Sequence, residues 1–398
     1  MNLLYYCDEY PPVRNGGIGT VVKLVAEAMA KRGHRVIVAG KYWEGQGRQT
    51  IEEINGVTVV RWHKEKYQTL GIRACNLIRD GERMRKVKMQ RVFDRTCQLI
   101  NNIIKEYSID LLELPDYVDD FVHYDTIEAS GKSFSVPTVM RVHGSASFLF
   151  HCVKGVEDEK RVIQDKAYFQ CADAVCAVSG FSKSYVKDWI GKDKSVDVIY
   201  NPIEDALFEN VTESGNADTI LFFGKVVETK GAFNLIKAFN AVAKRHPQAR
   251  LKLVGNGDIE AARGLVDTHC ADRVSFVGFM PKEQIMKEID QASFCVLPSY
   301  FENFSMAALE VLARKRALVY THRASGPELI EDGVNGLLVD PENVEQIAEK
   351  MDLLLSDADL CNRLASNGYE MCRNRFSTKV IIPQMEQYYR DLIARCRK

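Results

Sequence analysis

Short apolar runs alternate with amphipathic segments along the chain, and this alternation limits the folds that it can adopt. In the first half, seven apolar runs have the length and composition of strands, at residues 3–7, 35–39, 57–61, 109–113, 138–142, 174–178 and 196–200. Apolar residues at helical spacing lie between them, as at residues 18–31, 87–107 and 156–171. Apolar strands that alternate with helices are typical of a parallel sheet covered by helices on both faces.

The second half repeats this alternation, which indicates a second domain. Its apolar runs lie at residues 219–223, 251–254, 274–277, 294–297 and 318–320. Pro202 and the polar residues 212–218 separate the two halves. We therefore predict an α/β chain of two facing, doubly wound Rossmann-like domains, residues 1–203 and 204–377, followed by a helix over residues 378–398. Because ligands of such domains bind beyond the carboxyl ends of the strands, the active site is expected in the interdomain cleft.

Composition excludes several classes of protein. The formal net charge of the 398 residues is -1, whereas general nucleic-acid binders need a basic surface. No run of 18 apolar residues occurs, and the first eight residues lack the basic region of a signal peptide. The 11 cysteines form no Cys-x-x-Cys pair, and Cys7, Cys171, Cys176 and Cys295 lie in apolar runs. These features predict a cytoplasmic protein with reduced, buried thiols and no bound metal.

The segment from Glu302 to Glu310 combines two carboxylates with the start of a helix. It follows the apolar run 293–298, so a buried strand, a loop and a helix are expected in that order. Eight residues make a little over two helical turns, which would place both carboxylates on one side of the element. Amides at a helix N-terminus suit a phosphate, and the flanking acids suit sugar hydroxyls. The segment therefore predicts a nucleotide-sugar site.

Two lysines follow the first strand of the second half. Lys225 and Lys230 lie in a loop shaped by Gly224 and Gly231, and they can neutralise a diphosphate as point charges. Solvated loop lysines are the alternative. Their expected position opposite Glu302 favours the diphosphate.

Two further motifs come after strands in the first half. Gly16 and Gly17 open a helix, and glycines there permit close approach of a phosphate or a sugar. The spacing is not Gly-x-Gly-x-x-Gly, so a dinucleotide site is disfavoured, and a plain turn before the helix is the alternative. His143 follows the run 138–142, with Gly144 behind it. Its ring nitrogens can hydrogen-bond a sugar hydroxyl, although a lone histidine also serves structural roles.

Residues 79–95 hold seven basic residues and three acidic ones. Such a segment can bind an anionic acceptor or rest on an acidic membrane, and a solvated helix face is the alternative. With a lipid-linked acceptor, the protein would be peripheral at the inner face of the cell membrane.

Taken together, these residues resemble family 4 of the retaining glycosyltransferases with the GT-B fold. The resemblance covers nearly the whole chain and is most specific at residues 302–310, 224–231 and 335–341 and at Gly16-Gly17. It implies retaining transfer of a hexosyl group from a UDP- or GDP-linked sugar to a hydroxyl of a glycan, lipid-linked or small-molecule acceptor, in polysaccharide or glycolipid assembly. It also implies that residues 1–203 bind the acceptor, residues 204–377 bind the nucleotide sugar, and residues 378–398 cross back to the first domain.

The resemblance assigns roles at the donor site. Glu310 would bind the ribose hydroxyls, Glu302 would bind hydroxyls of the donor sugar, and His143 would touch that sugar near the reacting centre. Lys225 and Lys230 would stabilise the departing diphosphate.

Backbone groups complete the implied site. Amides of Phe304, Ser305 and Met306 would hold the distal phosphate, and Gly17 would approach the diphosphate from the first domain. The resemblance implies no cofactor and no metal, because lysines and amides replace the divalent ion.

Three residues depart from the family pattern. The family usually has arginine at the position of Lys225, which removes a bidentate phosphate contact. It usually has glycines at the positions of Asn303 and Ser305, so the loop is narrower here and the sugar that it accommodates is expected to differ.

Other functions fit the same architecture. They are a nucleotide-sugar epimerase or hydrolase, a GT-B phosphorylase, and a non-catalytic sugar-binding protein. A dehydrogenase would need a tighter glycine fingerprint and an acid about 20 residues later at a strand end, and neither is evident.

Overall fold

The computed structural model describes residues 1–12, 16–42, 50–63, 81–118, 134–188, 196–212 and 216–397. The chain divides into two compact units. The first comprises Met1–Pro202 together with Ile381–Lys398, and the second comprises Ile203–Val380. The first division lies one residue before the boundary predicted at residue 203, and the second lies three residues beyond the one predicted at residue 377.

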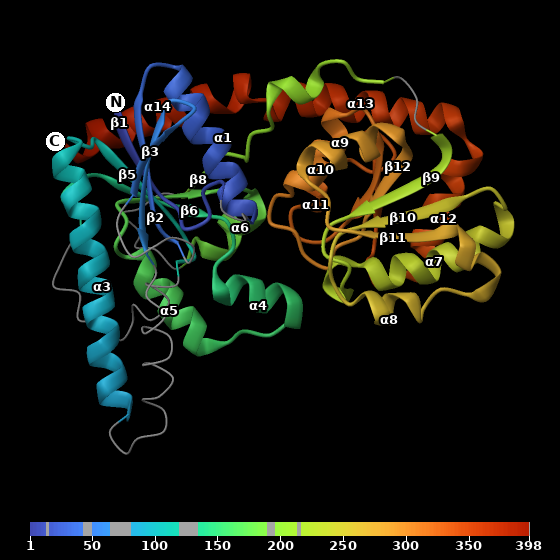
Figure 1. The fold of residues 1–398 in the computed structure, drawn as a ribbon, viewed down its shortest axis with the longest axis horizontal. Coiled ribbons are helices and arrows are strands. Elements are labelled where there is room, and N and C mark those ends of the chain that lie inside the picture. Colours follow the sequence, from blue (N-terminus) through green and yellow to red (C-terminus); the bar gives the residue numbers. More distant parts are fainter. Residues whose placement is uncertain are drawn as a thin grey trace. The chain divides into compact units, whose positions relative to one another are not determined.

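In its described residues, the first unit is built on an eight-stranded sheet with the order β3-β4-β2-β1-β5-β6-β7-β8 (Figure 1). All neighbouring strands pair in parallel except β3, which runs antiparallel to β4 at the edge. The strands are β1 (Asn2–Tyr6), β2 (Arg35–Tyr42), β3 (Thr50–Ile54), β4 (Val57–His63), β5 (Leu111–Pro115), β6 (Thr138–Val142), β7 (Ala174–Ala177) and β8 (Val196–Val198). The helices are α1 (Gly17–Lys31), α3 (Gly81–Glu106), α4 (Ala146–Lys154), α5 (Glu159–Phe169), α6 (Gly180–Val186) and α14 (Thr378–Cys396).

Successive side chains of the central strand β1 point to opposite faces of this sheet. Leu4 belongs to one buried cluster with Phe93 of α3 and Phe169 of α5. Tyr5 contacts Tyr389 of α14 instead, with ring centroids 6.5 Å apart. The sheet is therefore covered by helices on both faces, as its apolar strands require.

The second unit has a six-stranded parallel sheet with the order β11-β10-β9-β12-β13-β14 in its described residues. The strands are β9 (Asn216–Phe223), β10 (Arg250–Val254), β11 (Val274–Gly278), β12 (Ala292–Leu297), β13 (Ala317–Thr321) and β14 (Leu337–Val339). The α-helices are α7 (Ala232–Arg245), α8 (Ile259–Arg263), α9 (Lys282–Gln291), α10 (Met306–Ala313), α11 (Gly326–Leu329), α12 (Val344–Ser356) and α13 (Ala358–Phe376). Three short 3-10 helices complete the unit: η2 (Asp205–Phe208), η3 (Glu228–Lys230) and η4 (Thr268–Arg273).

The strand order of the second sheet changes direction between β9 and β12. The chain builds outward from β9 to β10 and β11, and then returns to the other side of β9 with β12. Loops at the carboxyl ends of two such strands diverge and leave a crevice, which is where open α/β sheets bind ligands. The loops after β9 and β12 are therefore the expected ligand-binding loops of this unit.

These two Rossmann-like units confirm the predicted α/β fold class. Strands β3 and β14 were not among the predicted runs. Strand β3 is mostly exposed and carries two glutamates, so it lacks an apolar signature, and it is held by its antiparallel pairing with β4. Strand β14 has only three residues, which is too short for a periodic pattern.

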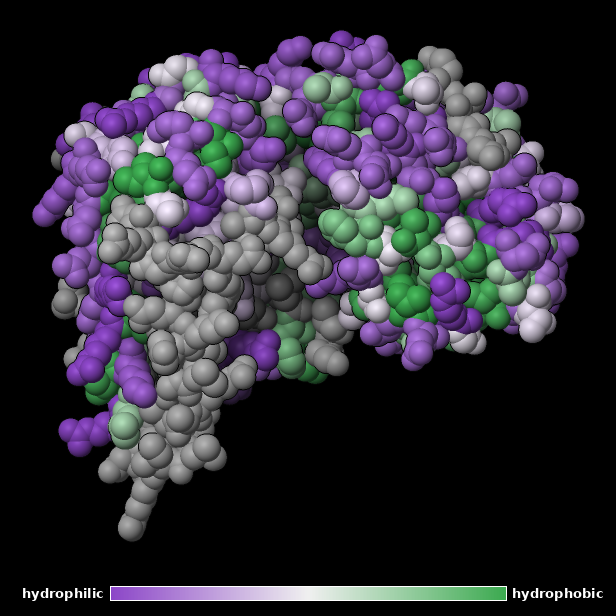
Figure 2. All heavy atoms as spheres, in the orientation of Figure 1, coloured by the Kyte–Doolittle hydropathy of each residue, from purple (hydrophilic) through white to green (hydrophobic). Residues whose placement is uncertain are grey.

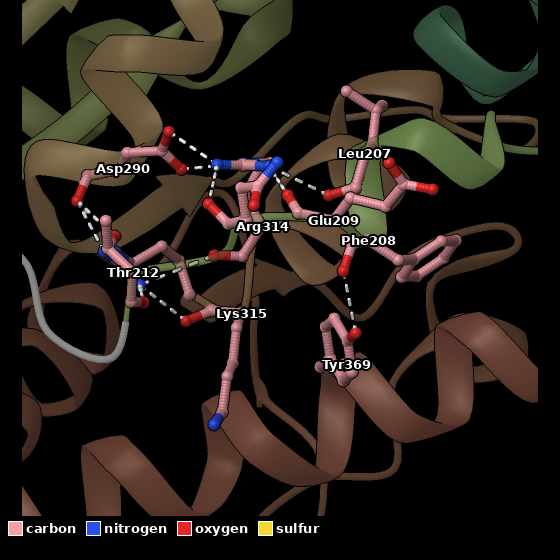
Figure 3. Close-up of polar contacts among 10 residues, drawn as sticks. Leu207, Phe208, Glu209, Thr212, Asp290, Arg314, Lys315 and Tyr369 are labelled. Carbon is pink, nitrogen blue, oxygen red and sulfur yellow. Dashed lines mark hydrogen bonds and ion pairs between the residues drawn. The ribbon is translucent and has the colours of Figure 1, made fainter.

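A buried arginine fixes the first residues of the second unit to its helices. Arg314, which follows α10, donates from Nε and Nη2 to the two carboxylate oxygens of Asp290 in α9, at 2.7 Å each (Figure 3). Its Nη1 also donates to the carbonyls of Leu207 and Glu209, at 3.0 Å each. The Arg314 guanidinium group thus donates both to the Asp290 carboxylate and to the backbone carbonyls, and these bonds hold residues 207–209 against α9 and α10.

The C-terminal helix α14 docks on the first unit through a buried acid as well as apolar residues. The Tyr389 hydroxyl hydrogen-bonds the carboxylate of Glu113 in β5. Burial raises the pKa of Glu113, while the charge of Arg141 and the hydrogen bond from Tyr389 act in the opposite direction. The apolar face of the helix is buried through Ile381, Ile382, Met385, Tyr389, Leu392 and Ile393. This placement is the one that the resemblance implies for residues 378–398.

Replacing Tyr389 by phenylalanine is expected to lower the free energy of unfolding by about 1–3 kcal/mol, because a buried carboxyl group loses its partner. Tyr388→Phe is the matched control, since the buried Tyr388 hydroxyl on the same helix bonds no other described residue. Urea denaturation followed by circular dichroism compares both variants with the wild type. Equal losses of stability would contradict a specific role for the bond to Glu113.

Candidate active site

The loops after β9 and β12 meet through backbone contacts in the second unit. The amide of Tyr300 donates to the carbonyl of Thr229 at 3.0 Å. Gly231 has a φ of +73°, and a Cβ there would lie 1.9 Å from the carbonyl oxygen of Pro298, so only glycine allows this approach. The contact brings two predicted site residues together: Lys230 Nζ lies 2.7 Å from Glu302 Oε1.

Glu302 lies in an extended loop and not on the helix that carries Glu310. Helix α10 begins at Met306, so the helical spacing assumed between the two carboxylates does not apply to Glu302. Ser305 supplies the reason, because its side chain accepts from the Ala308 amide and ends the loop as a helix cap. The loop is held by Ser325, whose hydroxyl donates to the Glu302 carbonyl at 3.0 Å.

The N-terminus of α10 presents backbone donors beside this ion pair. The amides of Met306 and Ala307 donate to no other described residue, whereas the Ala308 amide is capped by Ser305. Asn303 and Phe304 are buried in the preceding loop, and the Phe304 ring packs edge-on against an aromatic ring of α13. A helix N-terminus with free amides favours an anion such as phosphate.

The other two charged residues predicted for this site, Glu310 and Lys225, differ in their surroundings. Glu310 is buried in α10, and its Oε1 lies 2.9 Å from Nζ of Lys282. Lys225 is exposed in the loop after β9, and its side chain bonds no other described residue. The loop therefore carries one lysine already paired with a carboxylate and one available to an incoming anion.

In the first unit, the Glu9 carboxylate hydrogen-bonds backbone amides of the glycine loop. Glu9 Oε2 accepts from the amides of Gly16, at 3.1 Å, and Gly19, at 3.3 Å. A Cβ at Gly19 would lie 2.2 Å from the Glu9 carbonyl oxygen, so this glycine is required by close packing. A Cβ at Gly17 would meet no described atom within 4 Å. Gly17 thus keeps the accessibility that a ligand contact requires, while the Gly16 amide is already engaged.

His143 follows β6, and its loop is held by a buried acid. Asp116 accepts from the amides of His143 and Gly144, at 2.9 Å each. Burial and the charge of Arg141 lower the pKa of His143 to about 3, so its ring is neutral at pH 7. The ring bonds no other described residue, which leaves one nitrogen as a donor and the other as an acceptor for a ligand.

Asp116 and His143 are expected to give opposite pH dependences of stability. Burial raises the pKa of Asp116 to about 7, although its two backbone bonds act in the opposite direction. Its contribution to stability is therefore complete below about pH 4 and is lost as the pH rises through about 7. The lowered pKa of His143 has the reverse effect, since its contribution is complete above about pH 6.5 and is lost as the pH falls toward 3.

Urea denaturation between pH 4.5 and 7.5 tests these signs. Relative to the wild type, Asp116→Asn should become more stable as the pH rises, by up to about 1.4 kcal/mol per pH unit. His143→Gln should become less stable over the same range. If both differences are independent of pH, the titrations assigned to these two groups are wrong.

Four residues that organise the site were not among the sequence candidates: Lys282, Ser325, Asp116 and Glu9. Two of them had a local signal. Asp116 directly follows a buried strand, and Ser325 precedes a Gly-Pro-Glu sequence that is typical of a helix start. The contacts of Lys282 and Glu9 depend on tertiary packing and had no local signal.

Two general properties concern the part of the chain that the structure describes. No helix there is both long and apolar enough to cross a membrane. The four cysteines predicted to be buried, Cys7, Cys171, Cys176 and Cys295, are all buried and form no disulfide.

Comparison with known proteins identifies the family. Residues 15–207 match the family described as Glycosyltransferase Family 4, and residues 204–371 match Glycosyl transferases group 1. An uncharacterized glycosyltransferase of Methanocaldococcus jannaschii is 25% identical over 404 residues, which cover 96% of each protein. The structure is similar to sucrose-phosphate synthase from Thermosynechococcus elongatus, with a TM-score of 0.74, 22% identity and 99% coverage of both chains. It is also similar to Anabaena HepE in complex with UDP, with a TM-score of 0.72, 18% identity and coverage of 98% and 100%. The chain therefore belongs to the family 4 type of GT-B glycosyltransferases.

Proposed function

We propose that this glycosyltransferase moves a hexosyl group from a UDP- or GDP-linked sugar to a hydroxyl of an acceptor, with retention of configuration. The ion pair between Lys230 and Glu302, beside the free amides of Met306 and Ala307, carries the proposal. A carboxylate suits sugar hydroxyls, and a cation with helix amides suits phosphate. Their adjacency matches the point in a nucleotide sugar where the sugar joins the diphosphate.

The four charged residues predicted for this site then each have a role. Glu310 binds the ribose hydroxyls, and Glu302 binds hydroxyls of the sugar being transferred. The α10 amides hold the distal phosphate. Lys225 and Lys230 balance the charge that develops on the departing diphosphate, so the lysines and amides replace a divalent metal ion.

The proposed transfer needs no carboxylate nucleophile. The bond between the anomeric carbon and the phosphate oxygen breaks as the acceptor oxygen attacks the same face. The departing phosphate takes the proton of the acceptor hydroxyl, so a nucleoside diphosphate and a glycoside are formed. Neutral His143, in the first unit, is proposed to hydrogen-bond the donor sugar near this carbon.

Product analysis tests the proposal. The enzyme is first screened by calorimetry with UDP, GDP, ADP and their sugars, and UDP is a reasonable first ligand because Anabaena HepE was solved in complex with it. The preferred sugar nucleotide is then incubated with and without sugar acceptors, and released nucleoside diphosphate is measured. Release only with an acceptor supports a transferase, whereas release without one indicates a hydrolase, and a changed sugar without release indicates an epimerase. Proton NMR of the first product distinguishes retention from inversion.

For delivery of the acceptor, we propose that residues 79–95 bind an anionic surface. Arg79 lies outside the described residues, and the described part of the segment forms the first half of α3, which extends beyond the strands of the sheet (Figure 1). Met84 and Val87 are 42% and 48% exposed there, and hydrophilic side chains surround such apolar ones along this side of the first unit (Figure 2). Basic residues with exposed apolar ones between them are typical of interfacial helices.

Co-sedimentation with vesicles is expected to show salt-sensitive binding to anionic lipid and none to neutral lipid, since each basic residue near an anionic surface contributes about 1 kcal/mol. The double variant Arg83→Gln/Arg91→Gln should weaken this binding. Lys237→Gln/Lys244→Gln, which alters exposed residues of α7 in the second unit, is the matched control. Equal, negligible binding of the wild type to both lipids would favour a soluble acceptor.

A further inference from the structure

The ion pair between Lys282 and Glu310 connects two helices that lie apart in the sequence of the second unit. Lys282 is the first residue of α9, and Glu310 lies in α10. The two side chains approach to 2.9 Å between Nζ and Oε1. Because Glu310 is the proposed ribose ligand, the inference that follows rests on the proposed function.

The two partners differ in their contact with solvent. The Glu310 side chain is 11% exposed, whereas that of Lys282 is 46% exposed. Lys282 Nζ lies 2.9 Å from Oε1 of Glu310, and Oε2 bonds no other described residue. A carboxylate can accept about four hydrogen bonds, so Lys282 leaves room for two hydroxyl donors. The ion pair and a bound diol are therefore compatible.

Helix α9 is anchored at its far end, which fixes the position of its first residue. Asp290 at the end of α9 forms the buried pair with Arg314. The ammonium group of Lys282 is thus presented to Glu310 by a rigid element and not by a free loop.

We infer that Lys282 is a positioning residue that orients the Glu310 carboxylate for both hydroxyls of the donor ribose, and so sets the preference for ribonucleotides over deoxyribonucleotides. Without the ammonium group, the largely buried carboxylate has no cation to hold it in one orientation. It then turns toward water, and the hydroxyl contacts weaken. Lys282 acts through Glu310 and does not itself bind the ribose.

Calorimetry with UDP, GDP and their 2′-deoxy and 3′-deoxy analogues tests this role. The wild type should bind its preferred ribonucleotide at least about tenfold more tightly than either deoxy analogue, the size expected for a hydrogen bond to a charged group. Lys282→Met should weaken ribonucleotide binding by about tenfold, leave the deoxy analogues nearly unchanged, and bring the ratio close to one. Lys282→Arg should keep most of the wild-type preference for the ribonucleotide over the deoxy analogues.

Lys252→Met is the matched control, because it removes another ion pair of α9, the one between Lys252 of β10 and Glu288 at 2.6 Å, which does not involve Glu310. It should leave the ratio unchanged. Two results for Lys282→Met overturn the inference: an unchanged ratio, and tighter nucleotide binding, which would mean that Lys282 competes with the ribose for Glu310. A wild type that binds these nucleotides but does not discriminate against the deoxy analogues also overturns it. A wild type that binds no nucleoside diphosphate overturns the proposed function itself, and the inference falls with it.

Discussion

Replacing Lys230 by methionine is expected to lower kcat by about 10²-fold or more, the size seen when an enzyme loses one donor to developing negative charge. Lys225→Met is expected to have an effect of the same order, because both lysines come from the loop after β9 and share the charge of the departing diphosphate. Lys237→Met is the matched control, since Lys237 is an exposed lysine of α7 whose only bond to another described residue is to Asn234. Initial rates at saturating donor give kcat for each variant.

The two lysine variants differ in their expected effect on stability, and this effect must be separated from the effect on kcat. Lys230→Met leaves the Glu302 carboxylate without its partner, whereas Lys225→Met removes a side chain that bonds no other described residue. Thermal unfolding of each variant therefore accompanies the kinetics. Wild-type kcat in both variants would rule out the proposed role of the loop.

The same role predicts full activity in EDTA, because lysines and amides supply the positive charge that a divalent ion would otherwise provide. The rate is measured with EDTA alone, with added Mg²⁺ and with added Mn²⁺. An absolute requirement for either ion would contradict the metal-independent mechanism.

Alanine at the two site carboxylates is expected to separate binding from turnover. Glu310→Ala should weaken nucleoside diphosphate binding by about 10- to 100-fold, because the ribose contact is present in every bound state and a hydrogen bond to a charged group contributes about 1.5–3 kcal/mol. Glu302→Ala should chiefly lower kcat, since its partner is the sugar that changes during the reaction. Calorimetry with the nucleotide and steady-state kinetics measure the two effects.

Glu288→Ala provides the control for these variants. Glu288 also pairs with a lysine in the second unit, at 2.6 Å, but it belongs to the anchored end of α9. Its loss should leave kcat and nucleotide affinity near the wild-type values. If Glu302→Ala and Glu310→Ala behave like this control, the site has been assigned to the wrong residues.

Much of the fold was predictable because it depends on local periodicity. Apolar strands such as β7 and β12 have no exposed polar face, and their alternation with amphipathic helices indicates parallel sheets at the level of sequence. Strand β3 was not predicted, because an edge strand with exposed glutamates is stabilised by pairing with its neighbour and has no apolar pattern of its own. The strand, loop and helix expected around residues 293–310 are present, but helical spacing does not relate Glu302 to Glu310, because the side-chain cap at Ser305 starts the helix at Met306.

Residue type and local spacing were enough to predict the two α/β domains, the family resemblance and most of the chemical groups proposed for the site. Which of these groups meet depends on the tertiary fold. It paired Lys230 with Glu302, Lys282 with Glu310 and Glu9 with the Gly16 amide, and it held His143 through Asp116. The physical reason is that short-range electrostatic contacts need a few ångströms of precision between distant segments. That precision comes from strand order and close packing, such as the approach of Gly231 to Pro298, and no local pattern in the chain encodes it.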